Sequence, residues 1–514
     1  MKTMIVDLSI ALQIAFLLFC HCKSYAQEQG FLTRFSEEDH SWFVTDALES
    51  PNGYFLISAY DNWGASSLLL KLSAEGDVVA MTTVAAEDTT VYAYRLLQMP
   101  KESHSEYAVL CPSHPNDGST AALLFMRIDE DLNITYRKTI PCSFFDDGSK
   151  FYSAKFLLSD ACIFGALTSR LQSSPQSVFL TKFDLDGNIL GFQRDSLNSV
   201  CNLFQAEEGR IGLFGRIGPL HMGFLAFDSS LQLVGRDTIF NWSTLEGDNG
   251  DFCLYSISDH INSQGTLLPD GSHIVSARLF ESLCHANGYP YKDDRSAILS
   301  KYSDDFHQPE NMLVIEHMND SLEYPAFFRS MDFRETDEME CEVFQCSILN
   351  ELPQYGLLQP LPTGIVVTKT GQDLNVVWKK RFLRDGNYQA MAINATADGG
   401  CLVVGSVGDY QAQRFDVFAL KINANGTVGL EEVEEEALHP YVYYPNPARD
   451  ELRLRYSPDV QPKQIELYDL QGRLVRSQST GLENLDMEGL PAGTYTMRVT
   501  MEGGRTFSDK VVKE

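Results

Sequence analysis

Apolar residues between positions 30 and 430 recur in short runs that end at polar turns. One phrase is repeated: an apolar strand, often a basic residue, a turn containing Asp-Gly, Glu-Gly or Asn-Gly, and a second apolar strand. Its copies, about seven in number, begin at Leu68, Leu124, Phe179, Gly223, Ile298, Val366 and Phe418. Turn residues that tolerate positive φ between two apolar runs are typical of a β-hairpin. Each copy therefore predicts one hairpin.

Most copies follow a further strand-like run, such as 53–58, 210–215 or 400–405. Three or four strands in each repeat of roughly 45–75 residues predict the blades of a β-propeller. The phrase also resembles β-propeller repeats of bacterial surface proteins. We therefore expect an all-β, propeller-like body of about seven blades over residues 27–430. Two packed sandwiches or a β-solenoid are the alternatives, and wider spacing predicts insertions within about 236–296 and 310–362.

The pattern changes after residue 430. The acidic run 431–436 predicts a solvated linker, taken as 431–440. Apolar and polar residues then alternate over 452–456, 465–468 and 495–501, with turn residues between these segments. Such alternation predicts a small antiparallel β-sandwich over 441–514.

Several motifs of this last segment resemble the type A C-terminal sorting domain of the type IX (Por) secretion system. The matching residues are Pro445, Asn446, Pro447, Asp469, Gly472, Gly489, Pro491, Gly493, Tyr495, Lys510 and Lys513. The resemblance implies an immunoglobulin-like fold, recognition by the type IX secretion machinery, and removal by a sortase-like peptidase that attaches some cargo to surface lipopolysaccharide. An ordinary accessory sandwich is the alternative.

The N-terminus has the pattern of a secretory signal peptide over residues 1–26. Lys2 precedes the apolar run 8–20, and Ser24 and Ala26 supply small residues before a cleavage site at Gln27. A lipoprotein signal ending at Cys20 or Cys22 is the alternative. Together with the C-terminal resemblance, this predicts export through the periplasm to the cell surface or the medium.

The charge of the chain and its cysteines limit which partners and which metal or disulfide sites can be expected. The net charge of the chain is −30, and the two ends are nearly neutral, so the body is strongly acidic. An acidic body repels phosphate backbones, which argues against nucleic-acid partners. Cys341 and Cys346 suggest either a disulfide or, with Cys284 and His285, metal ligands, although their spacing matches no tight zinc pattern.

The sequence contains no recognisable catalytic motif. It lacks a Gly-x-Ser-x-Gly elbow, a His-Glu-x-x-His helix and a phosphate-binding loop. The run 184–188 resembles the start of a calcium loop, but the Glu at loop position 12 is missing, so a hairpin turn is the favoured interpretation. We therefore assign no catalytic residue, metal or cofactor, and expect a module that binds an unknown protein or glycan. A secreted carbohydrate-active or other hydrolytic propeller enzyme, with carboxylates gathered at the axis, is the alternative.

Overall fold

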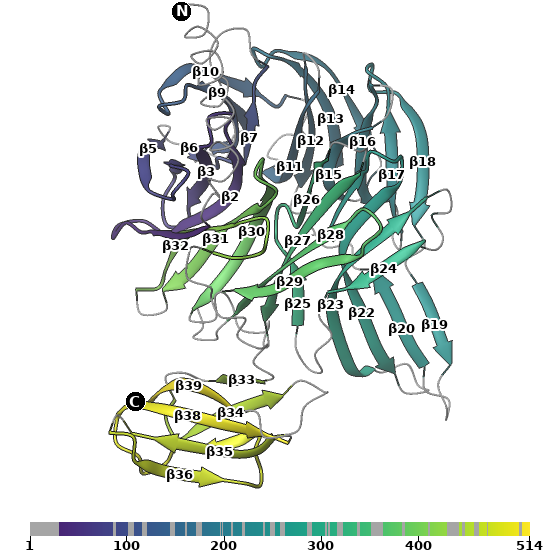
Figure 1. Ribbon diagram of the computed structural model, residues 1–514. Coiled ribbons are helices and arrows are strands. Elements are labelled where there is room, and N and C mark those ends of the chain that lie inside the picture. Colours follow the sequence, from purple (N-terminus) through teal and green to yellow (C-terminus); the bar gives the residue numbers. More distant parts are fainter. Residues whose placement is uncertain are drawn as a thin grey trace, which may run out of the picture.

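Figure 1 shows the computed structural model, whose described residues form β-strands and no α-helix. None of the described residues forms a helix able to cross a membrane. The expected signal peptide and cleavage site, Ala26 and Gln27, lie outside the described residues. The structure describes residues 30–428 and 441–513 apart from 86–88, 101–106, 116–120, 144–149, 160–161, 171–176, 196, 198, 207–208, 218–220, 240–241, 247–251, 258–262, 285–289, 304–305, 307–308, 316–321, 337–339, 351–362, 383–385, 410–411, 445–447, 457–461, 470 and 503–505.

The first four blades are separate antiparallel sheets that follow one another along the chain, each written here from its innermost to its outermost strand. Blade 1 contains β2 (Trp42–Glu49), β3 (Phe55–Asp61), β4 (Ser67–Leu72) and β5 (Val78–Val84). Blade 2 contains the short inner strands β6 (Thr89–Val91) and β7 (Arg95–Gln98), then β8 (Tyr107–Pro115), β9 (Ala122–Ile128) and β10 (Ile134–Pro141). Blade 3 contains β11 (Lys150–Ser159), β12 (Cys162–Arg170), β13 (Ser177–Asp184) and β14 (Ile189–Asp195). Blade 4 contains β15 (Ser199–Gln205), β16 (Ile211–Arg216), β17 (Met222–Phe227) and β18 (Leu233–Ile239).

Three further blades complete the set. Blade 5 contains β21 (Gln264–Leu267), β22 (His273–Cys284), β23 (Pro290–Tyr302) and β24 (Asn311–Val314). Blade 6 contains β26 (Met331–Glu335), β27 (Cys341–Asn350), β28 (Gly364–Gly371) and β29 (Val376–Phe382). Blade 7 contains β30 (Asn387–Ala395), β31 (Cys401–Asp409), β32 (Arg414–Ile422) and β1 (Phe31–Phe35). The described residues thus form seven blades, and the expected propeller is confirmed (Figure 1).

Blades 5 and 6 are also joined by an additional sheet. The strands β19 (Trp242–Glu246), β20 (Phe252–Ile257) and β25 (Leu322–Pro325) lie in the two segments where repeat spacing predicted insertions. β20 pairs with the second half of β22, and β25 pairs with both β23 and β27. The two inserted segments therefore contribute to one continuous sheet.

The ring is closed by the N-terminal strand of the body. β1 pairs with β32, with Phe31 opposite Lys421, so the first strand completes the last blade. Every pair of neighbouring blades shares a hydrophobic cluster, including blades 7 and 1, where Trp42 and Val44 pack with Val404. A solenoid or two stacked sandwiches would not bury a cluster between the first and last units. Closure thus excludes both alternatives.

In four of the repeats, the basic residue of the repeated phrase links its blade to the next. Because its charged end reaches a turn of the following blade, it donates to backbone carbonyls that the turn leaves unpaired. The pairs are Lys71 Nζ with Glu130 O (2.7 Å), Arg127 Nη2 with Leu185 O (2.7 Å), Lys182 Nζ with Ser229 O (2.8 Å) and Lys369 Nζ with Gly399 O (3.1 Å). The basic position of the phrase therefore holds blades together.

The hairpin turns of the repeated phrase share one geometry, in which the residue with positive φ is either a glycine or a leucine. In the run 184–188, Asp184 Oδ1 accepts hydrogen bonds from the backbone N–H groups of Asp186 (2.9 Å) and Asn188 (2.7 Å), which confirms a turn. Gly187 has φ of 71°, and Phe125 of blade 2 lies where its side chain would be. In three other turns a leucine takes the positive φ and its buried side chain enters the cluster between blades; these are Leu132 (64°), Leu231 (65°) and Leu374 (62°).

Residues 441–513 form two further antiparallel sheets around a cluster of their own. One contains β33 (Tyr441–Tyr444), β34 (Glu451–Tyr456) and β37 (Asn484–Asp486). The other contains β36 (Leu474–Gln478), β35 (Pro462–Tyr468), β38 (Gly493–Met501) and β39 (Thr506–Lys513). The cluster includes Leu452, Ile465 and Val499, all without exposed surface. The immunoglobulin-like connectivity and the boundaries at 26, 430 and 440 stay predictions.

The cysteines do not form the suggested disulfide. Cys341 and Cys346 are free and lie five residues apart on β27, a spacing of roughly 16 Å along a strand. A disulfide needs Cα atoms within about 7 Å, so this interpretation is wrong. The side chain of Cys284 and the whole of His285 lie outside the described residues. Within the part that the structure describes, no group of three or more His, Cys, Asp or Glu residues could hold a metal ion.

Candidate functional site

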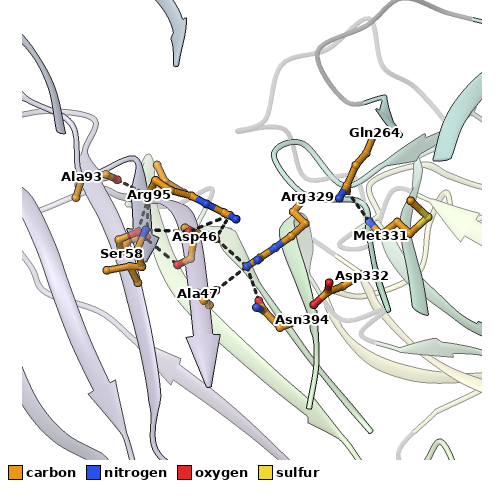
Figure 2. Close-up of polar contacts among 12 residues, drawn as sticks. Asp46, Ala47, Ser58, Ala93, Arg95, Gln264, Arg329, Met331, Asp332 and Asn394 are labelled. Carbon is orange, nitrogen blue, oxygen red and sulfur yellow. Dashed lines mark hydrogen bonds and ion pairs between the residues drawn. The ribbon is translucent and has the colours of Figure 1, made fainter. Parts of the chain in front are cut away.

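The innermost strands meet around a buried carboxylate on β2. Asp46 accepts hydrogen bonds from Arg95 Nη1 of β7, at 3.1 and 3.2 Å, and from the backbone N–H of Leu96, at 2.9 Å. Arg329 Nη2 donates to the same carboxylate at 2.7 Å, and to Ala47 O and Asn394 Oδ1 (Figure 2). Both oxygens of Asp46 are thus occupied by residues of blades 2 and 6.

Arg329 reaches blade 1 because its own segment leaves blade 6. Residues 326–330 precede β26 and hydrogen-bond to the innermost strand of blade 7: Phe328 N–H donates to Met391 O (2.8 Å), and Ile393 N–H donates to Arg329 O (3.0 Å). Met331 N–H donates to Gln264 Oε1 of blade 5 at 3.0 Å (Figure 2). Inter-blade bonds at the inner edge therefore fix this segment at the centre of the ring.

Phe328 extends to the opposite side of the ring. Its ring centroid lies 5.2 Å from that of Tyr94, beside β7, in an edge-to-face arrangement. Lys155 Nζ, from β11, lies 5.8 Å from the centre of the Phe328 ring. A residue of blade 6 thus contacts residues of blades 2 and 3. We call Asp46, Tyr94, Arg95, Lys155, Phe328 and Arg329 the axial cluster.

Burial displaces the pKa values of several groups in or beside the axial cluster, among them Asp332 and Lys155. Burial raises the pKa of Asp332, although Arg329, the backbone N–H of Ala395 and Arg95 oppose the shift. Burial likewise lowers the pKa of Lys155 to about 8, against the opposing influence of Cys201 and Asp46. An amine that loses this much of its basicity in a fixed position is a frequent feature of functional sites.

A row of aromatic side chains continues from the axis across blades 1 to 3. Phe43 lies 5.3 Å from Tyr60, Tyr60 lies 5.0 Å from Tyr92, Tyr92 lies 5.7 Å from His114, and His114 lies 5.8 Å from Phe151. These five residues, the aromatic row, are all partly exposed. They lie near the ends at which the innermost strands β2 and β11 begin, so they share one end of the propeller.

The sequence did not indicate the axial cluster. Its members come from four different blades and share no motif or regular spacing. Each lies in or beside an innermost strand, and the only signal for these residues was a charged or aromatic side chain in an apolar run. Ring closure, which depends on the whole body, brings them together.

The predicted motif residues of the C-terminal segment are placed mainly at turns. Asp469 Oδ1 accepts the backbone N–H groups of Gln471 (2.9 Å) and Arg473 (3.0 Å), and Gly472 takes φ of 75°. Gly489 also takes a positive φ, 76°. Pro445, Asn446 and Pro447 lie outside the described residues.

The other motif residues belong to the last two strands. The hydroxyl of buried Tyr495 donates to Pro491 O at 2.7 Å, so the tyrosine closes the turn before β38, which Gly493 begins. Lys510 is exposed on β39, whereas Lys513 is buried and lies 4.0 Å from Asp450. The motif therefore combines turn geometry with anchoring of the last strand; a role in recognition stays a prediction.

A partly buried hydrogen bond also fixes β39 against β33. The hydroxyl of Tyr441 bonds to Asp509, and burial, then the Asp509 carboxylate, raise the pKa of Tyr441. The phenol consequently remains a donor across the physiological range. Val511 of the same strand has no exposed surface. The last strand is thus part of the core of this segment.

Comparison with known proteins gives different results for the body and for the C-terminal segment. No curated protein sequence matches the chain. Similar solved structures include a Dos1 propeller (11% identity, 75% of this chain, 80% of that chain, TM-score 0.39) and the Swd1 β-propeller domain of Myceliophteria thermophila (10%, 76%, 99%, 0.36). A protein of unknown function from Dyadobacter fermentans is similar at 9% identity, over 77% of this chain and 98% of that chain, with a TM-score of 0.37.

The C-terminal comparison is more specific. Residues 442–514 match the family described as "Secretion system C-terminal sorting domain". This match covers both sheets around the Tyr441–Val511 cluster and all the motif residues named above. The chain therefore carries a type IX secretion system C-terminal sorting domain at residues 442–514, and it is exported to the cell surface or extracellular space.

Proposed function

We propose that the exported body is a binding module that takes its ligand at the end of the propeller carrying the aromatic row. The observation that carries this proposal is the chain of contacting, partly exposed rings from Phe43 to Phe151. Aromatic side chains present a large contact area at low cost in conformational entropy, and they concentrate where binding energy is highest. A rigid ring of blades fixes their positions.

The hydrolase alternative receives less support from the axial residues. A glycosidase needs two carboxylates about 5–10 Å apart on either side of the scissile bond. The buried Asp46 carboxylate is occupied by two arginines and a backbone N–H, and Asp332 accepts the backbone N–H of Ala395 at 2.9 Å. Both carboxylates thus connect blades, which favours a structural role for them.

The proposal is tested by screening the purified mature chain against glycan and protein arrays. Tyr92→Ala and Phe151→Ala remove partly exposed rings of the aromatic row, and each should weaken capture of the same ligand about tenfold or more, as loss of a central aromatic contact does. Tyr136→Ala, which removes an exposed ring on the outermost strand of blade 2, is the matched control. Ligand capture that survives both aromatic-row substitutions would refute this location.

For delivery, we propose that a signal peptide ending at Ala26 directs the chain to the periplasm. We also propose that a sortase-like peptidase removes the sorting domain, with attachment to lipopolysaccharide as one product. The acidic run 431–436 between the two parts supports this order of events, because charged connecting segments are favoured sites of proteolysis. Mass spectrometry of surface material would show a C-terminus within or near 431–440; an intact C-terminus at Glu514 would contradict removal.

A further inference from the structure

The axial cluster concentrates positive charge in a strongly acidic protein. The chain carries a net charge of −30, yet Arg95, Lys155 and Arg329 converge on Asp46. The second nearby carboxyl, Asp332, accepts the backbone N–H of Ala395 at 2.9 Å. Three cationic groups therefore face two carboxyl groups here, although the chain as a whole is strongly acidic.

Two of these cations have capacity left for a ligand. Arg95 bonds to Asp46 through Nη1, its Nη2 makes no hydrogen bond within the described residues, and 30% of its side chain is exposed. Lys155 Nζ makes no hydrogen bond or ion pair within the described part of the chain, and its side chain is partly exposed. The Lys155 ammonium contacts the face of the Phe328 ring and keeps its hydrogen-bond donors available for a ligand.

Aromatic surfaces adjoin these cations. Phe328 lies between Tyr94, at 5.2 Å, and Lys155 Nζ, at 5.8 Å, and all three side chains are partly exposed. Tyr94 directly precedes Arg95 in the chain, so its ring and the guanidinium begin from adjacent backbone atoms. The cluster thus presents two rings beside two positive groups.

We propose that the axial cluster binds the carboxylate of an acidic sugar residue at the end of a glycan. Arg95 and Lys155 hold the carboxylate through charge-assisted hydrogen bonds, and Tyr94 and Phe328 pack against the C–H face of the sugar ring. This inference rests on the proposed binding function and specifies the ligand. It places the acidic sugar next to the aromatic row, along which the rest of the glycan extends.

The charge of the body limits the ligand to one or few negative groups. A polyanion such as heparin would bring many charges close to a surface of net charge −30, and the repulsion would exceed the attraction of the axial cations. A terminal uronic or sialic acid brings one carboxylate. The protein should therefore distinguish acidic sugar ends from sulfated chains.

The test uses the mature chain and isothermal titration calorimetry with a trisaccharide ending in N-acetylneuraminic acid and a disaccharide ending in glucuronic acid. Their methyl esters remove the charge and keep the shape. Lys155→Met removes the cation, Lys155→Arg keeps it, and Lys380→Met on the outermost strand of blade 6 is the matched control. Acetate, phosphate and heparin are titrated separately.

We expect at least one acidic oligosaccharide to bind. Its methyl ester should bind the unaltered chain about tenfold to a hundredfold more weakly, and the acid should bind Lys155→Met more weakly by the same factor, which is the loss that follows removal of a charged hydrogen bond. Lys155→Arg and Lys380→Met should leave binding unchanged. Equal binding of acid and ester, equal affinity for free phosphate or acetate, or tighter binding of heparin would overturn the inference. If the chain instead binds a protein or a neutral glycan, and Tyr92→Ala abolishes this binding while Lys155→Met does not, the inference fails while the proposed function stands.

Discussion

Asp46 is predicted to be essential for the stability of the propeller ring. Its carboxylate joins blade 1 to Arg95 of blade 2 and to Arg329 from blade 6, and only 2% of the side chain is exposed. Asp46→Ala would leave the guanidinium of Arg95 and the N–H of Leu96 without their acceptor, and it would remove the bonded carboxylate that balances the charge of Arg329. Removing one partner of a buried ion pair costs about 3–5 kcal/mol of unfolding free energy.

The two contacts do not contribute equally to that loss. Arg329 retains 13% exposure of its side chain, whereas Arg95 retains 30% and can recover water in the variant. Most of the loss should therefore arise from Arg329. Asp46→Asn keeps one acceptor oxygen and the shape of the side chain, so it should cost about 1.5–3 kcal/mol, the contribution of hydrogen bonds to charged groups.

Tryptophan fluorescence during urea unfolding measures this effect in the body alone. All four tryptophans, at positions 42, 63, 242 and 378, precede the sorting domain. A stability change appears as a lower midpoint with an unchanged slope. Asp131→Asn, in an exposed turn of blade 2, should change the unfolding free energy by less than about 0.5 kcal/mol. A loss below about 1 kcal/mol for Asp46→Ala would show that the ring does not depend on this buried ion pair.

Three further outcomes are expected. Burial lowers the pKa of Lys155 from 10.5 to about 8, so between these pH values the folded chain binds fewer protons than the unfolded chain. The free energy of unfolding should therefore rise with pH across this window. Lys155→Met should remove the rise, and identical pH profiles for the variant and the unaltered chain would disprove the shift. Leu231→Gly should relieve about 1–2 kcal/mol of positive-φ strain but lose about 2–5 kcal/mol of buried packing, for a net destabilisation by urea unfolding; a stabilised variant would mean that the leucine side chain contributes little between blades 3 and 4. N-terminal sequencing of exported protein should begin at Gln27, whereas a lipid-modified Cys20 or Cys22 would establish the lipoprotein alternative.

The hairpins were visible in the sequence because their determinants are local. Asp184 and Gly187 lie within one turn, so the residues that cap it and supply the positive φ are adjacent in the chain. The sorting-domain motif is visible for the same reason, since Tyr495 closes a turn only four residues upstream at Pro491. Patterns of this kind allowed the blades and the sorting domain to be predicted.

Features that depend on ring closure were not visible. Leu132, Leu231 and Leu374 take a conformation that leucine normally avoids because each side chain fills a gap against a neighbouring blade. Local turn preferences give no indication of that gap. The axial cluster has the same origin: Asp46 and Arg329 are 283 positions apart and meet only when blade 7 closes against blade 1.

The central claim is that the folded sorting domain at 442–514 delivers the propeller body across the outer membrane. Val499 on β38 has no exposed surface, whereas Thr496 on the same strand is exposed. Val499→Asp therefore places a charge in the core of the sorting domain, and Thr496→Asp places the same charge on its surface. Burying an unpaired carboxylate costs several kcal/mol, enough to unfold a small domain.

The decisive measurement is the distribution of the body between periplasm, cell surface and medium in the native host, detected by antibody. The account predicts that Val499→Asp accumulates in the periplasm with native tryptophan fluorescence of its body, while Thr496→Asp reaches the surface or medium like the unaltered chain. Normal surface delivery of Val499→Asp, with its sorting domain shown to be unfolded by protease digestion, would contradict the claim that the folded domain is what the secretion machinery reads.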